Sequence, residues 1–328
     1  MNSNPTPSFR PSGPLRRIVA VVLNYRTPDL TIQAAHSVAA DLSPGEDRVV
    51  VVDNHSPDDS LEKLRAGLDL HKYPHIELVA SPDNGGFAAG NNVGILAVSA
   101  QAYLLLNSDT IVRQGATKQL LSTLQKSPEV GIASPRLQFE DDQAQISCFR
   151  HHSLMSELIS GAQTGPVTRL LKRWDVPLGV QETEAPVPWT SFACVLIRRE
   201  VFEKVGLLDE GFFMYYEDAD YCRQVNASGF RIVHNPAAQV VHLRGKSSPV
   251  KEAGRLGKAR PGYFYAARAR YFRRAYGPWG AALANIMWTT GRAIALPREI
   301  LGNKKPHTVD REFYDKWRDT FDQGPRRP

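Results

Sequence analysis

The chain has 328 residues, of which 42% are hydrophobic and 23% are charged, so it can bury the core of one large globular domain with an appended region. Its formal charge of +6 is concentrated in the C-terminal third, and such a surface suits nucleic acid, diphosphates or an anionic membrane without choosing among them. Three widely separated cysteines without a CxxC or Cys/His spacing argue against disulfide and zinc frameworks and predict a cytoplasmic protein.

Residues 1–16 are expected to form a disordered lead-in. Their first 14 positions are rich in Pro, Ser and Asn and contain no apolar segment of the kind found in secretory signals. No stretch of the chain reaches the roughly 18 to 20 apolar residues of a membrane span, so we expect no transmembrane helix.

The next segment has the pattern of a βαβ unit. Residues 18–23 and 49–52 are continuous apolar runs that end in polar groups, and a helical pattern over 29–40 lies between them. A second helix over 61–70 and a third strand over 76–80 follow. Because continuous apolar runs are typical of strands buried on both faces, the sequence predicts an α/β fold with a parallel sheet.

A glycine-rich segment over 83–92 then leads into a helix that reaches about residue 100. Glycine permits positive φ and close backbone approach, and exposed amides at a helix start favour anions. The segment is neither a Walker loop nor a GxGxxG fingerprint, so its glycines alone are weak support for phosphate binding.

The strand predicted over 103–106 stops at a small polar cluster that contains Asn107 and Asp109. Ligands of open α/β sheets bind at the carboxyl ends of strands. A carboxylate and an amide there can hold Mg²⁺ or Mn²⁺, which would neutralise the diphosphate of a nucleotide-linked donor. A strand capped by an Asx turn gives the same pattern without a ligand.

A helix over 117–125 and a strand over 131–137 come next. Residues 140–188 are polar and irregular, which is typical either of a lid or acceptor-binding element over the sheet or of a variable surface loop with one helix. Residues 189–198 are strand-like, and 199–205 form a short helix.

A second acidic cluster, Glu217, Asp218 and Asp220, follows five apolar residues at 212–216. Apolar surroundings and neighbouring like charge raise the pKa of a carboxyl group, so one member can serve as a general base. On a helix, Glu217 and Asp220 share a face while Asp218 points elsewhere, toward a pocket. An acidic helix start stabilised by the macrodipole is the alternative, but it does not account for the apolar run.

Two further apolar runs are expected to be strands, over 230–233 and 240–243. The second presents His242, which is followed by a glycine, Lys246 and two serines, a set suited to phosphate oxygens. His234 has no such neighbours and is interpreted as structural.

Taken in order, six runs resemble the family 2 inverting glycosyltransferases, and most of all the bacterial rhamnosyltransferases of cell-wall and O-antigen assembly. They are residues 21–25, 51–56, 84–92, 105–110, 216–222 and 242–247. The resemblance covers roughly residues 17–276 and implies a GT-A fold, a nucleotide-binding and mostly parallel sheet flanked by helices. The expected organisation is therefore a glycosyltransferase domain over 17–276 and a C-terminal helical extension with a tail over 277–328.

The resemblance also implies site roles. Asp218 corresponds to the general base, which deprotonates an acceptor hydroxyl as it attacks the anomeric carbon with inversion. Asp109 and His242 correspond to ligands of Mg²⁺ or Mn²⁺. The expected substrate-binding residues, with Asp53 at the nucleobase, are Asn24, Asp53, Asn84, Asn91, Asn107, Trp189, Glu217 and Lys246.

Three positions depart from the family pattern. Asn107 replaces an aspartate and is a weaker metal ligand, so we expect weaker metal binding at this position than in the family. Phe192 stands where relatives often carry glycine, and Gln224 stands where they commonly carry an arginine that this chain has one place earlier, at Arg223.

The segment 281–301 mixes aliphatic residues with Trp288, Arg292 and Arg298. An amphipathic helix at the membrane interface would suit a polyprenyl-linked acceptor, and a core-packing or dimer helix is the alternative. Pro297 is expected to end or kink this helix.

The function expected from the resemblance is transfer of L-rhamnose from dTDP-rhamnose to a glycan or lipid-linked acceptor, on the inner face of the cytoplasmic membrane. A UDP-hexose or galactofuranose donor and a nucleotide-sugar-binding module without turnover are the alternatives. Nucleic-acid binding is not expected, since no aromatic-basic interleaving or helix-turn-helix spacing accompanies the basic residues.

Overall fold

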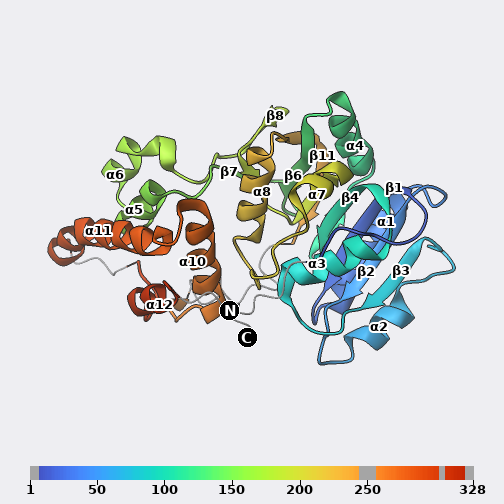
Figure 1. The fold of residues 1–328 in the computed structure, drawn as a ribbon, viewed down its shortest axis with the longest axis horizontal. Helices are drawn as coiled ribbons and strands as arrows, with labels where there is room; N and C mark the ends of the chain where they lie inside the picture. Colours follow the sequence, from blue (N-terminus) through green and yellow to red (C-terminus); the bar gives the residue numbers. More distant parts are fainter. Residues whose placement is uncertain (1–6, 244–255, 303–306, 322–328) are drawn as a thin grey trace.

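The computed structural model describes residues 7–243, 256–302 and 307–321, which form a sheet domain and a group of helices beside it (Figure 1). In the described residues the central sheet has nine strands, in the order β3-β2-β1-β4-β10-β6-β11-β5 with β8 beside β11. The strands are β1 Arg16–Asn24, β2 Arg48–Asp53, β3 Ile76–Ala80, β4 Ala100–Asn107, β5 Thr110–Val112, β6 Val130–Gln138, β8 Ala185–Pro186, β10 Cys194–Arg198 and β11 Arg231–His242. A separate two-stranded sheet pairs β7 Cys148–Phe149 with β9 Trp189–Thr190.

The helices divide between the two faces of the sheet and the neighbouring helical group. They are α1 Pro28–Asp41, α2 Ser60–Gly67, α3 Gly86–Ala97, α4 Ala116–Lys126, α5 Leu154–Ala162, α6 Gly165–Leu170, α7 Arg199–Val205, α8 Glu217–Ala227, α10 Gly262–Tyr276, α11 Gly280–Leu301 and α12 Glu312–Arg318, with a 3-10 turn, η1, at Lys172–Trp174. No helix in the described ranges is long and apolar enough to span a membrane.

Alternate residues of β1 pack into different halves of the core. Val19 and Val21 face the layer that contains α3, α7 and α8, whereas Ala20 and Val22 face α1, α2 and α4. Both faces are therefore covered, as the continuous apolar runs predict. The α/β class and the sheet flanked by helices are confirmed, with a parallel half, β3-β2-β1-β4, and a mixed half that contains the antiparallel β10.

Strand register sets the polar edge of the sheet. In the parallel pairing of β1 with β2, Asn24 lies opposite Asp53, and in the pairing of β1 with β4, Leu23 lies opposite Asn107. Three strands thus end at one edge and deliver polar side chains from distant parts of the chain to the same place. This edge is where open α/β sheets bind ligands.

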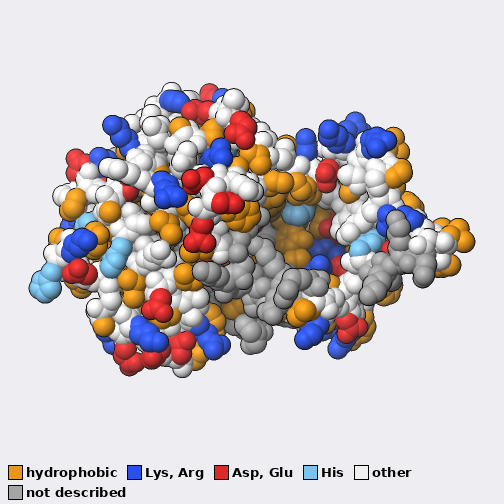
Figure 2. Space-filling view, turned by 180° about the vertical axis from the view of Figure 1, so that it is seen from behind, with side chains coloured by type: hydrophobic (Ala, Val, Ile, Leu, Met, Phe, Trp, Pro, Cys, Tyr) orange, Lys and Arg blue, Asp and Glu red, His pale blue; other side chains and the backbone are white. Residues whose placement is uncertain are grey.

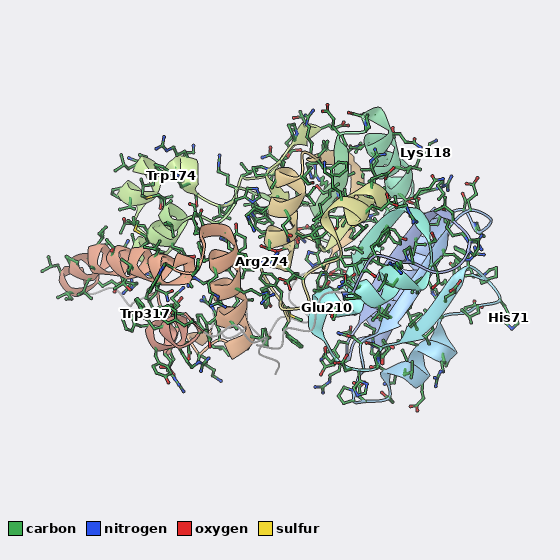
Figure 3. The ribbon with its side chains drawn as sticks, in the orientation of Figure 1. His71, Lys118, Trp174, Glu210, Arg274 and Trp317 are labelled. Atoms are coloured by element: carbon green, nitrogen blue, oxygen red, sulfur yellow. The ribbon has the colours of Figure 1, made fainter. Side chains whose placement is uncertain are left out.

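The helical group comprises α5, α6, α10, α11 and α12, and α11 packs along α5 and against α10 (Figure 1). Arg274 of α10 joins it to the sheet domain, since its guanidinium lies 3.0 Å from Asp220 on α8 and 3.3 Å from Asp209. Figure 3 shows Arg274 and Glu210 at this junction. Helix α10 also packs with α11 and α12. The domain boundary that the sequence predicts at residue 276 stays a prediction.

Several predicted elements are corrected. Phe9 stacks on Phe202 with ring centroids 5.4 Å apart, and Ser12 bonds to the backbone of Leu96 and Ser99, so the predicted disordered segment contacts the sheet domain at these two residues. The strand-like run over 189–198 is split into β9 and β10. Conversely, the two strands expected near 230 and 240 are one strand, β11, interrupted by a register shift between Asn235 and Gln239.

Helix α11 does not end at Pro297 but continues through it to Leu301. Proline removes the amide that would bond the carbonyl four residues earlier, at Ala293. Ala293 and Pro297 both lie on the exposed side of the helix, where water can satisfy that carbonyl.

Candidate active site

A cavity of about 890 Å³ lies between the polar edge of the sheet and the helical group. Its sheet-side wall includes Asn84, Asn107, Asp109, Glu217, Asp218 and His242, all expected site residues. Figure 2 shows the hollow between the two parts, with hydrophobic and charged side chains in its walls. Residues from the start of α10 and from α12 close the opposite side.

Asn24 and Asp53 meet just behind this wall. The Asn24 amide donates to Asp53 at 2.7 Å, and Ser56 donates to the same carboxylate oxygen from its hydroxyl at 2.7 Å. Both side chains are almost fully buried, and neither lines the cavity. Asn54, which the sequence did not single out, lines it instead and donates to the Asn84 side chain at 3.0 Å. The predicted contact of Asp53 with a nucleobase stays a prediction.

The glycine-rich segment acts through its backbone. Gly86 has φ +88°, and a Cβ at this position would lie 2.0 Å from the carbonyl oxygen of Phe213. The Phe87 amide donates to that same carbonyl at 2.7 Å, and the Gly86 amide donates to Asn84 at 3.1 Å. The Gly86 and Phe87 amides are therefore occupied within the protein, and this part of the segment holds the chain that leads into α8. Phosphate binding by the glycine-rich segment stays a prediction.

Asn91 lies one turn into α3 and does not line the cavity. Its amide nitrogen donates to the Phe87 carbonyl at 2.9 Å, while its buried carbonyl oxygen has no hydrogen-bond partner in the described structure. The side chain thus fixes the first turn of the helix. Its predicted contact with the nucleotide stays a prediction.

Asp109 and His242 come together because β5 and β11 pair antiparallel, with Thr110 opposite His242. The Nε2 atom of His242 lies 3.4 Å from Oδ1 of Asp109, and both side chains are largely buried at the cavity wall. Asn107 ends β4, two residues before Asp109, and its buried amide oxygen has no hydrogen-bond partner within the described ranges. A carboxylate, an imidazole and an unsatisfied amide oxygen thus line one side of the cavity.

These three side chains fit a divalent metal ion. In the part of the chain that the structure describes, no group of three or more His, Cys, Asp or Glu side chains could hold a metal by itself. Mg²⁺, however, is usually held by one or two carboxylates together with substrate phosphates. The side chains of Asp109 and His242 and the oxygen of Asn107 are thus compatible with such an ion when a diphosphate supplies further ligands.

Glu217 and Asp218 begin α8 and enter the cavity from a strained turn. Tyr215 and Tyr216 both have positive φ, at 72° and 66°, which bulky residues adopt only when the surroundings enforce it. Two sets of contacts hold the turn in this conformation. Tyr216 packs against Phe264 and Tyr271, and Phe213 contacts Gly86.

Burial dominates the electrostatics of the pair. It raises the pKa of Asp218 to about 6, although the Ala219 amide, which donates to Asp218 at 2.7 Å, favours the ionised form. Burial and the charge of Asp218 raise the pKa of Glu217 well above its ordinary value, and one buried Glu217 oxygen has no partner in the described residues. Asp218 is therefore poised to accept a proton near neutral pH.

Trp189, an expected substrate-binding residue, lies in the core and does not line the cavity. Its ring stacks on Phe149 at 4.3 Å, and its indole donates to the Arg150 carbonyl at 2.8 Å. The cavity wall at this point comes from the link between β9 and β10, which contains Phe192. Lys246 lies outside the described residues.

The sequence missed the wall formed by the helical group. Four residues of this wall line the cavity although they are 18 to 76 residues from His242, the nearest site residue expected on the sheet side: Arg260, Arg311, Asp315 and Arg318. The concentration of basic residues near the C-terminus was the one available signal, and it did not indicate which of them share a cavity.

The comparisons agree with this geometry. The profile of glycosyl transferase family 2 matches residues 18–206, more than half of the chain. The chain belongs to glycosyl transferase family 2. The GT-A fold and the glycosyltransferase activity that the sequence motifs predict are thereby confirmed.

Relatives of this family 2 glycosyltransferase include rhamnosyltransferases. The N-acetylglucosaminyl-diphospho-decaprenol L-rhamnosyltransferase of Mycobacterium tuberculosis is 25% identical over 269 residues, which are 77% of this chain and 82% of the relative. The dTDP-rhamnosyl transferase RfbF of Shigella flexneri is 26% identical over 242 residues, 70% of each chain. The mannosyltransferase PcManGT from Pyrobaculum calidifontis, solved with GDP-Man and Mn²⁺, has a TM-score of 0.53 at 15% identity and is matched over 97% of this chain and 90% of its own.

Proposed function

We propose that this glycosyltransferase moves an L-rhamnosyl group, with inversion, from dTDP-rhamnose to a hydroxyl of a glycan or lipid-linked acceptor. One observation carries the chemistry: Asp218 lines the same cavity as Asn107, Asp109 and His242. A base and a diphosphate-binding set thus flank one space that can hold both a nucleotide-sugar and an acceptor hydroxyl.

The reaction follows from the placement of these groups. The acceptor hydroxyl donates its proton to Asp218 as its oxygen bonds to the anomeric carbon. The bond from that carbon to the diphosphate oxygen breaks, and a single displacement inverts the configuration. Asn107, Asp109 and His242 would hold Mg²⁺ or Mn²⁺, and the bound ion would neutralise negative charge on the departing diphosphate.

The choice of donor is supported by the relatives. Two of those described above are named rhamnosyltransferases, one of them a dTDP-rhamnosyl transferase. Their sequence identity of 25–26% supports rhamnose as the donor sugar, but it does not establish which pocket residues contact that sugar. Donor selectivity rests on a few such contacts, and Phe192 in the cavity wall is one of the positions where this chain departs from the family pattern.

We further propose that the protein lies peripherally on the inner face of the cytoplasmic membrane through α11. The side of α11 that faces away from α5 exposes Leu283, Ile286, Ile294 and Leu301, with 42%, 50%, 45% and 87% of their surfaces accessible. The outer end of the helical group is hydrophobic in Figure 2. An exposed apolar stripe with basic neighbours is typical of helices that lie in a membrane interface.

Sedimentation with anionic vesicles tests this placement. We expect Ile286→Glu with Ile294→Glu to lose vesicle binding. Leu70→Glu, which changes an equally exposed apolar residue after α2, should retain it. Vesicle-independent dimers that the double variant abolishes would instead show that α11 is a dimer interface.

The donor proposal is tested with a panel of dTDP-, UDP- and GDP-sugars, with and without Mg²⁺ or Mn²⁺, in the presence of lipid-linked acceptors. Metal-dependent turnover of dTDP-rhamnose that is lost in Asp218→Asn is the expected result. Turnover of a UDP-hexose or galactofuranose donor would keep the chemistry and change the sugar. Tight nucleotide binding without turnover of any donor would contradict the catalytic proposal.

A further inference from the structure

The helical group contributes a basic wall to the cavity. Arg260 precedes α10, Arg311 precedes α12, and Arg318 lies in the last turn of α12, and all three line the cavity. The residues that fit the diphosphate of the donor belong to the sheet edge instead. The cavity therefore has a second cationic region on a separate structural element.

Two of the three arginines have carboxylate partners. Arg260 pairs with Glu312 at 3.2 Å, and Arg318 pairs with Asp315 at 3.3 Å and with Asp319 at 3.4 Å. Arg311 contacts the Tyr314 ring at 5.2 Å and has no acidic partner in the described residues. A buried Nε of Arg318 also has no acceptor there. Arginine without a full set of acceptors favours phosphate, which its planar guanidinium binds through paired hydrogen bonds.

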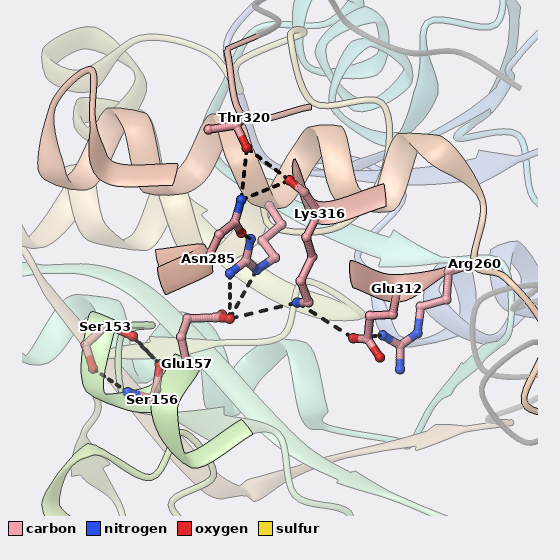
Figure 4. Close-up of polar contacts among 9 residues, drawn as sticks. Ser153, Ser156, Glu157, Arg260, Asn285, Glu312, Lys316 and Thr320 are labelled. Carbon is pink, nitrogen blue, oxygen red and sulfur yellow. Dashed lines mark hydrogen bonds and ion pairs between the residues drawn. The ribbon is translucent and has the colours of Figure 1, made fainter. Parts of the chain in front are cut away.

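A buried polar network fixes the position of this wall (Figure 4). Glu157 of α5 accepts from Arg268 of α10 at 2.6 Å, and Arg268 donates to Asn285 of α11 at 2.7 Å. Asn285 in turn donates to the Lys316 carbonyl at 3.0 Å and to the Thr320 hydroxyl at 2.9 Å. Four helices are thereby joined, and α12 holds its arginines at the cavity before any ligand arrives, which lowers the cost of binding.

The outer side of α12 is apolar. Phe313 and Tyr314 are each 56% exposed, and the exposed rings of Trp279 and Phe321 pack edge to face at 5.9 Å nearby in the same helical group. Exposed aromatic residues that adjoin a binding site are typical of a surface that takes an apolar ligand group. One short helix thus presents arginines to the cavity and aromatic rings to the outside.

We propose that Arg311 and Arg318, with Arg260, bind the phosphate groups of an amphiphilic acceptor, whose hydrocarbon chain leaves the cavity over Phe313 and Tyr314. This inference rests on the proposed glycosyl transfer. Phosphate could come from the acceptor or from the nucleotide donor. We assign it to the acceptor because the donor's diphosphate has its own ligands at the sheet edge, Asp109 and His242.

Arg311→Ala is the variant of choice, since Arg311 is exposed and outside the buried network. Two acceptors with the same sugar are compared, one on a lipid diphosphate and one on a neutral alkyl group. We expect the preference of kcat/KM for the diphosphate acceptor to fall about 10- to 100-fold, as for loss of a charge-assisted hydrogen bond. Arg65→Ala, which removes an exposed arginine of α2, should keep the wild-type preference.

Equal losses with both acceptors, or a raised KM for the donor, would overturn the inference by showing a structural role or a role in donor binding. Wild-type protein that uses both acceptors equally would also overturn it.

If no donor and acceptor react, the proposed function fails, but the subsite can still be measured. With dTDP saturating, calorimetry should show that farnesyl diphosphate binds wild type and that Arg311→Ala weakens this binding. No binding to wild type, or equal binding to both proteins, would refute the subsite.

Discussion

Glu217 and Asp218 are neighbouring carboxyl groups with different expected protonation states. Burial raises the pKa of both. Asp218 keeps a hydrogen bond from the Ala219 amide that favours its ionised form, whereas a buried Glu217 oxygen has no partner in the described structure. Glu217 should therefore remain protonated while Asp218 ionises, and only Asp218 can act as the base.

Asp218→Asn keeps the shape of the side chain and removes the base, so we expect kcat to fall by about 10²- to 10⁴-fold with little change in nucleotide affinity. Glu217→Gln imitates a neutral carboxylic acid and should keep most of the activity. In wild type the rate follows the ionised fraction of Asp218, whose pKa is raised to about 6. Activity should therefore rise with pH through about 6, and at about pH 5 roughly one-tenth of the plateau should remain.

The assay is release of nucleoside diphosphate in the presence of acceptor, measured across this pH range in wild type and both variants. Calorimetric titration with dTDP confirms that each variant still binds nucleotide. A large loss in Glu217→Gln without one in Asp218→Asn would refute the assignment of Asp218 as the base. An acid limb near pH 4, as for an exposed aspartate, would contradict the effect of burial.

Three further perturbations follow from the structure. Asp109→Asn should raise the Mg²⁺ or Mn²⁺ concentration needed for half-maximal turnover, and an unchanged metal requirement in a titration would contradict its assignment as a ligand. In urea denaturation, Gly86→Ala should lower the free energy of unfolding by more than Gly115→Ala does. Both glycines have positive φ, which costs about 1–2 kcal/mol for alanine. Only at Gly86 would the added Cβ also clash with a backbone carbonyl, that of Phe213. Glu157→Gln leaves Arg268 without its charged partner and should cost about 3–5 kcal/mol in the same measurement, and a loss near zero would show that the pair is not buried in solution.

The sheet-side wall was predictable because its signals are local. An apolar run that ends in a polar residue marks a strand and its end, and parallel strands bring those ends to one edge. Asn107 and Asp109 were found in this way, and Asp218 through its apolar neighbours. The resemblance to a family implied that these three residues share one site, and all three line the same cavity in the structure.

Other features depend on packing that no local pattern expresses. Phe9 looks like part of a polar tail until Phe202 covers it. Asn54 follows the more conspicuous Asp53, and only strand geometry decides that the asparagine reaches the cavity. Arg311 and Arg318 line the cavity because Glu157 on α5 contacts both Arg268 on α10 and Lys316 on α12, and each of these contacts spans more than one hundred residues of sequence.

The network around Glu157 also defines what can be exchanged between related enzymes. The sheet-side wall of the cavity and the wall formed by the helical group belong to different segments of the chain. A chimera can therefore replace one wall and keep the other. Exchange of the C-terminal region alone would not suffice, because Arg268 and Lys316 would then lack Glu157, the carboxylate that both contact. Helix α5, encoded in the middle of the chain, has to be inherited together with α10, α11 and α12 for a new acceptor wall to assemble.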